Sequence, residues 1–235
     1  MEKFFRISFL LFFLSSVNAA NALSVDTMLL VSDKSGNGFF TLTNDDAYTS
    51  YVVGSITKLD VKEGDITRTP YNEENLSSWD ITLSHPKLII EPGIQRNVGI
   101  RSLCINECGF DEDHVYQINF APSPYSENEG EAPIVALNVG YAPLFIIPAK
   151  ESKVSYDLEY KDDSIHVKNT GNTFIRIGID QCGESINREC RVAYTVLAGR
   201  NKSFNLPKGV QGDSLNTVII NHDNSYVKRL KLNKK

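Results

Sequence analysis

Short apolar runs separated by turn residues recur along the whole chain, and hardly any segment spaces its apolar residues at the helical period. The runs are rich in β-branched and aromatic residues, and clusters of Gly, Asn, Asp and Pro lie between them. We predict strands at residues 22–31, 38–43, 50–60, 81–83, 87–90, 98–103, 115–120, 134–147, 154–160, 164–168, 173–180, 191–196, 202–206, 216–221 and 225–232. The pattern restarts after Pro148, which predicts an all-β fold of two tandem immunoglobulin-like β-sandwich domains.

The domain border is predicted where two apolar runs are joined by Pro-Ala-Lys-Glu-Ser-Lys at 148–153. We therefore place the first domain at 23–148 and the second at 149–235. A polar loop at 122–133, rich in Glu, Pro and Ser, precedes the last strand of the first domain.

That last strand, 134–147, is long, uncharged and β-prone. Alternation places four of its larger side chains on one face: Val135, Leu137, Val139 and Tyr141. Pro143 then interrupts the run, as prolines do at sheet edges and bulges. A long apolar edge without charged residues is an aggregation hazard unless another strand pairs with it. The alternative is an ordinary core strand covered by the rest of its sheet.

Residues 1–22 have the form of a signal peptide, with Lys3 and Arg6 before an apolar run at 7–14 and small residues at 19–22 for cleavage. The mature chain then carries 22 Lys and Arg against 28 Asp and Glu, a net charge of −6. An acidic balance argues against nucleic acid as a partner. No later run is long and apolar enough for insertion in a membrane, so we expect an exported protein.

Four cysteines form two close pairs, Cys104 with Cys108 and Cys182 with Cys190. In an exported chain such pairs indicate disulfides, each of which closes a small loop. A zinc site is the alternative, but no CxxC knuckle is present and His114 is the only nearby histidine.

Motifs that carry catalysis are absent from the sequence, which has no Gly-x-Ser-x-Gly, no His-Glu-x-x-His and no phosphate-binding Gly-rich loop before a helix. The four histidines are scattered. We therefore expect a binding or assembly protein rather than an enzyme, with no metal and no other cofactor.

The order and spacing of several weak motifs resemble the periplasmic chaperones of chaperone–usher pili. The motifs are Ala-Leu-Ser-Val-Asp at 22–26, Phe-Phe-Thr-Leu-Thr-Asn-Asp at 39–45, Pro-Lys-Leu-Ile-Ile-Glu-Pro-Gly at 86–93, Tyr-Gln-Ile-Asn-Phe at 116–120, the run 134–148, and Val-Lys-Asn-Thr-Gly-Asn at 167–172. Finer features are similar to the alternate, colonisation-factor branch: Ser78-Trp79-Asp80, Tyr141-Ala142, the Cys182 and Cys190 pair, and Asn221-His222-Asp223.

The resemblance implies a non-catalytic mechanism in the periplasm. Pilin subunits lack their last strand, and these chaperones lend an edge strand to the open groove before an outer-membrane usher receives the subunit. The two sandwiches enclose a cleft in a boomerang-like shape. On this basis the predicted subunit-binding residues are Val135, Leu137, Val139 and Tyr141. The alternative is that this face packs on the chaperone's own core and that Ile134 and Ala136 face the subunit. Self-association of the free form through the same strand stays open.

Two departures from the family pattern affect the cleft. The family anchors the subunit's terminal carboxylate with two basic residues, whose positions here hold Met28 or Leu29 and a residue near Pro143. Lys150, Lys153 and Arg101 are basic residues that could replace the missing pair. The family also has an interdomain charge network, which predicts here a network of Arg101 with Asp113 and Asp223.

Two other functions compete with a chaperone. A structural pilin or adhesin would need an extended N-terminal donor arm, whereas this chain has a long internal strand and a full second strand set. A sandwich-fold carbohydrate hydrolase would need paired carboxylates in a cleft, and Trp79 is the only tryptophan that could line a sugar site.

Overall fold

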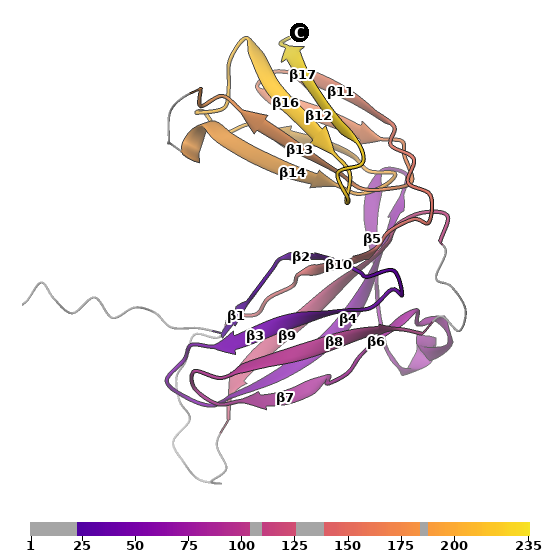
Figure 1. The fold of residues 1–235 in the computed structure, drawn as a ribbon, viewed down its shortest axis with the longest axis vertical. Coiled ribbons are helices and arrows are strands. Elements are labelled where there is room, and N and C mark those ends of the chain that lie inside the picture. The colour runs from indigo at the N-terminus through magenta and orange to yellow at the C-terminus, as the bar shows by residue number, and fades with distance from the viewer. Residues whose placement is uncertain (1–22, 104–109, 126–138, 184–187) are drawn as a thin grey trace, which may run out of the picture.

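The computed structural model describes residues 23–103, 110–125, 139–183 and 188–235 as two β-sandwiches joined in tandem (Figure 1). The predicted signal peptide lies outside these residues, as do Cys104, Cys108, Val135 and Leu137. In the described ranges no helix is long and apolar enough to cross a membrane. The predicted all-β fold of two tandem immunoglobulin-like sandwiches is confirmed.

Two sheets form the first sandwich. One has the order β1 (Leu23–Val25), β3 (Gly38–Asn44), β8 (Gln95–Ser102) and β6 (Ile81–Leu83). The other has the order β2 (Leu29–Val31), β10 (Leu144–Ile147), β9 (His114–Pro124), β4 (Ser50–Lys62) and β5 (Asp65–Pro70), with β7 (Lys87–Ile90) also paired to β4. Alternate residues of each strand fill the space between the sheets, so that Phe40 and Leu42 are buried while Phe39 is 54% exposed.

The second sandwich is smaller. Its sheets have the orders β11 (Tyr156–Lys161), β12 (Ser164–Asn169), β15 (Asn201–Asn205), and β14 (Arg191–Val196), β13 (Ile175–Asp180), β16 (Ser214–Ile220), β17 (Val227–Asn233). Its core includes Ile165, Ile177 and Leu215.

The single strand expected at 22–31 is wrong, because the chain changes sheets within it. β1 pairs antiparallel with β3, whereas β2 pairs parallel with β10 in the opposite sheet. The chain passes from one sheet to the other at Asp26. The Asp26 carboxylate stabilises this change by accepting from the N–H groups of Thr27 (3.0 Å) and Thr41 (3.1 Å). The first strand therefore contributes to both sheets.

The hairpin of β4 with β5, of which only β4 is among the predicted strands, reaches the second sandwich (Figure 1). At its tip the Gly64 carbonyl accepts from Arg200 Nη1 (2.8 Å) and from the Asn201 N–H (3.1 Å). Gly64 has φ +86°, and a Cβ there would lie 2.8 Å from the Asn201 Cβ, so this contact requires glycine.

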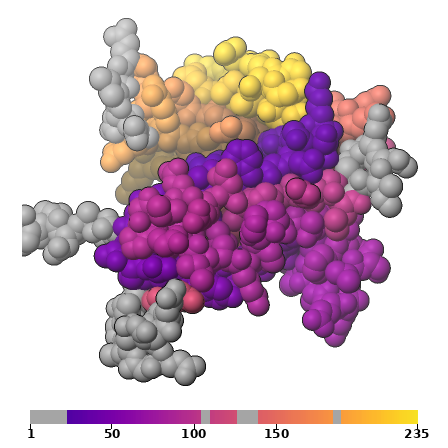
Figure 2. Space-filling view, turned by 60° about the horizontal axis from the view of Figure 1, so that its bottom comes forward, coloured from indigo at the N-terminus to yellow at the C-terminus, as the bar shows by residue number. Residues whose placement is uncertain are grey.

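An apolar cluster also joins the sandwiches. Leu59, Val115 and Ile146 of the first sandwich pack with Phe174 and Leu197 of the second, and all five are buried. Figure 2 shows the orange and yellow second sandwich seated against the indigo N-terminal segment of the first. Burial of this cluster favours one fixed angle between the sandwiches.

Candidate functional site

The described part of the predicted subunit-binding strand begins at Val139. β10 itself covers Leu144–Ile147, and upstream of it Tyr141 forms an isolated bridge with Phe120 of β9. The Phe120 N–H donates to the Tyr141 carbonyl (2.7 Å), and the Tyr141 N–H donates to the Phe120 carbonyl (3.0 Å). The segment 141–147 therefore follows β9 in one register, interrupted at Pro143.

Tyr141 lies beside the core of the first sandwich, whereas Val139 is exposed. Tyr141 lies opposite Phe120, and residues directly opposite in an antiparallel pair share a face. Phe120 is buried in the first core, whereas Val139, two residues before Tyr141 on the same alternation, is 45% exposed. The apolar face thus continues beyond the part that the protein's own core covers.

One edge of this segment carries no strand among the described residues. β2 pairs with β10 only from Leu29 opposite Leu144, and the Leu144 N–H donates to the Met28 carbonyl (2.9 Å). Before Met28 the chain lies in the other sheet, where β1 pairs with β3. Among the described strands, only β9 therefore flanks residues 139–141, and their other edge is open.

Asp113 is the polar centre of the junction between the sandwiches. Its side chain is buried and accepts hydrogen bonds from the N–H groups of Phe174 (2.7 Å) and Ala149 (2.9 Å) and from the Thr173 hydroxyl (3.1 Å). Burial raises the pKa of the Asp113 carboxyl, while these donors act in the opposite sense. One side chain of the first sandwich therefore fixes the linker and the start of β13.

The structure does not bring together the three residues of the predicted charge network. Arg101 is exposed on β8, in the sheet opposite β9, and forms no ion pair with any described acidic residue. Asp223 accepts from the N–H and hydroxyl of Ser225 in an exposed turn. Its neighbour His222 faces the junction instead, with its ring 6.4 Å from that of Phe174. Two backbone N–H groups and the Thr173 hydroxyl, rather than an arginine, satisfy Asp113.

A second polar group stands beside the junction, at the start of β9. Lys58 Nζ lies 2.7 Å from Asp80 Oδ2, which also accepts from the Tyr116 hydroxyl (3.0 Å). Burial opposes ionisation of Asp80, but Lys58, together with the Tyr116 hydroxyl and His114, outweighs it and holds the pKa of Asp80 below its usual value. Burial, together with the positive charge of Lys58, lowers the pKa of His114, whose Nδ1 is 3.7 Å from Asp80 Oδ2.

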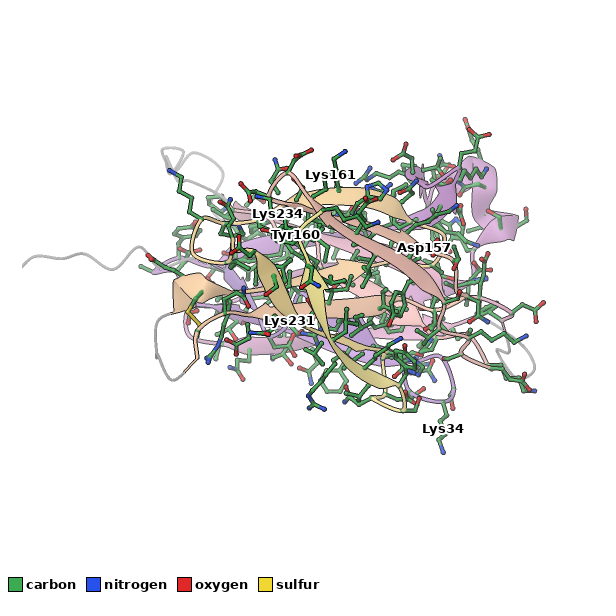
Figure 3. All side chains as sticks on the ribbon, turned by 90° about the horizontal axis from the view of Figure 1, so that it is seen from above. Lys34, Asp157, Tyr160, Lys161, Lys231 and Lys234 are labelled. Atoms are coloured by element: carbon green, nitrogen blue, oxygen red, sulfur yellow. A yellow bond between two sulfur atoms is a disulfide. The ribbon has the colours of Figure 1, made fainter. Side chains whose placement is uncertain are left out.

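A cleft of about 490 Å³ lies where β10 ends. It is lined by residues 31–34 and 36, the linker residues 147–150 and His222. The buried His222 Nδ1 has no hydrogen-bond partner in the described part of the chain. Lys150 and Lys34 are the cations of this lining, and Figure 3 shows Lys34 projecting from the body of the molecule. Lys150 is among the cations that the sequence suggests for this role, whereas the position of Lys34 in a turn gives no signal for it. Lys153 and Arg101 do not line this cleft.

Of the predicted cysteine pairs, Cys182 and Cys190 form a disulfide. It closes the loop between β13 and β14 at the end of the second sandwich. Cys104 and Cys108 lie outside the described residues, so their pairing stays a prediction.

Comparisons with known proteins agree with this fold. The family model described as the CS5 fimbrial protein N-terminal domain matches residues 25–148. A relative from Escherichia coli, an uncharacterized 25.9 kDa protein in the CS5 3′ region, is 26% identical over 176 residues, 73% of this chain and 75% of the relative.

Two solved structures are similar over nearly the whole chain. The class 5 fimbriae chaperone CfaA aligns with a TM-score of 0.51 and 14% identity over 91% of this chain and 99% of that chain. A chain from the complex of the Salmonella enterica SafA pilin with the SafB chaperone aligns with a TM-score of 0.59 and 13% identity, over 92% of this chain and 99% of that chain. At these identities the likeness shows the fold.

Proposed function

Because the chain belongs to the family of the CS5 fimbrial protein N-terminal domain, we propose that it is a periplasmic chaperone of the chaperone–usher type, which binds fimbrial subunits by lending an edge strand. The observation that carries the proposal is the exposed apolar face that continues past Tyr141 to Val139. The shared fold with chaperones solved with a pilin or a tip adhesin supports it.

In this mechanism the free edge of the segment pairs with a subunit through backbone hydrogen bonds, and alternate side chains enter its groove. We propose Val135, Leu137, Val139 and Tyr141 as those side chains. Each fully buried aliphatic side chain contributes about 1.5–3 kcal/mol, so three of them would account for most of a micromolar affinity, about 8 kcal/mol. The subunit would then be handed to an outer-membrane usher, without any catalytic step.

The cleft at the end of β10 is the place we propose for the subunit's C-terminal carboxylate. Its lining holds Lys150 and Lys34. The two positions that are basic in the pilus chaperones hold Met28 or Leu29 here, and a residue near Pro143. Replacement of both lysines by Gln should weaken binding of a subunit and leave binding of a subunit with an amidated C-terminus unchanged.

A co-purification experiment tests the proposal. The tagged chain is expressed in a bacterial periplasm with a fimbrial subunit encoded beside its own gene, and the soluble one-to-one complex is measured. Val139→Asp should reduce the complex at least tenfold, because a carboxylate would be desolvated in the groove. Val227→Asp is the matched control, since Val227 is 46% exposed and Val139 is 45% exposed.

The outcome separates the two functions that the sequence left open. Loss of the complex with Val139→Asp and with Leu137→Asp, but not with Val227→Asp, supports strand lending. A wild-type chain that keeps none of several candidate subunits soluble contradicts the chaperone and favours a structural pilin or adhesin.

A further inference from the structure

Charge is divided unevenly between the two sandwiches. Residues 23–148 carry seven Lys and Arg against 18 Asp and Glu, a net charge of −11. Residues 149–235 carry 15 Lys and Arg against ten Asp and Glu, a net charge of +5. A basic domain within an acidic protein indicates a surface for a negatively charged partner.

Basic side chains gather on one face of the second sandwich. The outer face of the β14–β13–β16–β17 sheet presents four cations, which we call the cationic face: Arg176, Arg191, Arg229 and Lys231. Its single acid, Asp180, is paired with Arg191 (2.9 Å). Arg176, Arg229 and Lys231 form no ion pair with a described residue. Three positive charges on this face are therefore uncompensated.

The opposite sheet of the same sandwich has no such excess. In β11 and β12, Asp157 lies opposite Lys168 and Glu159 lies opposite His166. Lys234 pairs with Asp163 (2.6 Å), and Figure 3 shows Lys161 well apart from Lys231. The excess of cations is a property of one face rather than of the whole domain.

The cationic face is hollowed. A trough of about 550 Å³ runs over Gly178 and Val218, with Arg229 and Lys231 along one side. A Cβ at residue 178 would lie 3.0 Å from the Val218 Cγ1, so a side chain there would crowd the floor of the trough. Gly178 and its ladder partner Val218 form the small, apolar part of the floor, and Asp180, Asn216 and Thr217 contribute polar atoms beside them.

Lysines on an edge strand also prevent unwanted pairing, and β17 is an edge strand. That role accounts for Arg229 and Lys231. It does not account for Arg176, because β13 lies in the interior of the sheet between β14 and β16.

We propose that the cationic face binds an extended acidic segment of a partner protein. Such a segment can lie in the trough with carboxylates reaching Arg229 and Lys231 of its lining, and Arg176 one row beyond its end. The acid in the lining, Asp180, is already paired with Arg191. A lipid bilayer is flat on this scale and would leave the trough empty. A second copy would bring its acidic first sandwich to this face in a head-to-tail contact, which does not close and would build open chains.

The cationic face lies in the second sandwich and shares no residue with the segment 139–147. Binding of an acidic segment can therefore fail while strand lending holds, and the reverse.

The experiment uses the mature chain and a fluorescent decaglutamate peptide, with anisotropy measured at 20 and 150 mM salt. The triple variant Arg176→Gln, Arg229→Gln, Lys231→Gln should bind the peptide at least tenfold more weakly than wild type. The control Lys161→Gln, Lys168→Gln, Lys202→Gln removes the same charge from exposed residues of the other sheet and should change binding less than twofold. Wild-type binding should weaken with salt.

Three results would overturn the proposal. Equal weakening in both triple variants would mean that net charge, not this face, binds the peptide. Binding to phosphatidylglycerol vesicles but not to decaglutamate would assign the face to a membrane. Salt-sensitive self-association of wild type in sedimentation, lost in the cationic-face variant, together with no peptide binding, would assign it to a second copy.

Discussion

Asp113→Ala tests whether the junction is held by one buried carboxylate. The substitution leaves the N–H groups of Phe174 and Ala149 without partners, and these residues are 1% and 6% exposed. Each buried unpaired donor costs about 1–3 kcal/mol. Burial of the Asp113 carboxylate is itself unfavourable, as its raised pKa shows. Its removal therefore offsets part of this loss of stability. We expect a net loss of about 3 kcal/mol in the free energy of unfolding.

Urea unfolding is the assay, followed by fluorescence and by circular dichroism. Trp79, the only tryptophan, lies in the first sandwich and reports its unfolding, while circular dichroism reports both sandwiches. Asp223→Ala and Arg101→Glu are the controls, since Asp223 bonds only within its own turn and Arg101 is exposed. Each should change stability by less than about 0.5 kcal/mol. A loss below about 1 kcal/mol for Asp113→Ala refutes the reasoning, and a loss for Arg101→Glu as large as that for Asp113→Ala would restore the predicted charge network.

Three further predictions follow from contacts elsewhere. Cys182→Ser with Cys190→Ser should lower the stability of the second sandwich by about 2–3 kcal/mol in urea, because the bridge closes a loop with a sequence separation of 8; an unchanged midpoint would contradict this. Arg200→Ala should cost about 1 kcal/mol and broaden spin-label distances between the sandwiches, since Arg200 holds the tip of the β4–β5 hairpin; an unchanged distance distribution would show that the apolar cluster suffices. The pKa of His114 is lowered in the folded state, so the unfolded chain binds its proton first as the pH falls, and stability is lost from about pH 6.5 downward. The loss of stability between pH 7.5 and 5.5 should be smaller in His114→Gln than in wild type, and equal losses would assign the effect to other groups.

Strands with strict alternation were predictable from the sequence, and those without it were not. β14 lies where the pattern places it, because Val192, Tyr194 and Val196 repeat at every second position. β5 was missed because Asp-Ile-Thr-Arg-Thr-Pro is polar and mostly exposed. Its signal was the turn before it, where Glu63 and Gly64 both have positive φ in a two-residue hairpin.

The junction between the sandwiches could be predicted only in part. Asp113 and an arginine partner follow from the resemblance, but two of the three groups that donate to Asp113 are backbone N–H groups, which leave no trace in side-chain identity. A buried carboxylate needs compensation, and these three hydrogen-bond donors can supply it as well as a charge can. The same reasoning explains why Arg101 is free to be exposed.

The hydrogen-bonded ladder between β9 and the segment 141–147 ends at Tyr141 because of residues in β9. The Phe120 N–H points to Tyr141, and every second residue of a strand presents its N–H to the same edge. The next two residues on that edge are Pro122 and Pro124, which have no N–H to donate. Pro143, in the segment that pairs with β9, also has no N–H to donate to β9. β9 therefore cannot hold the segment before Tyr141 with complete hydrogen-bonded pairs, and Val139 lies exposed where that ladder stops.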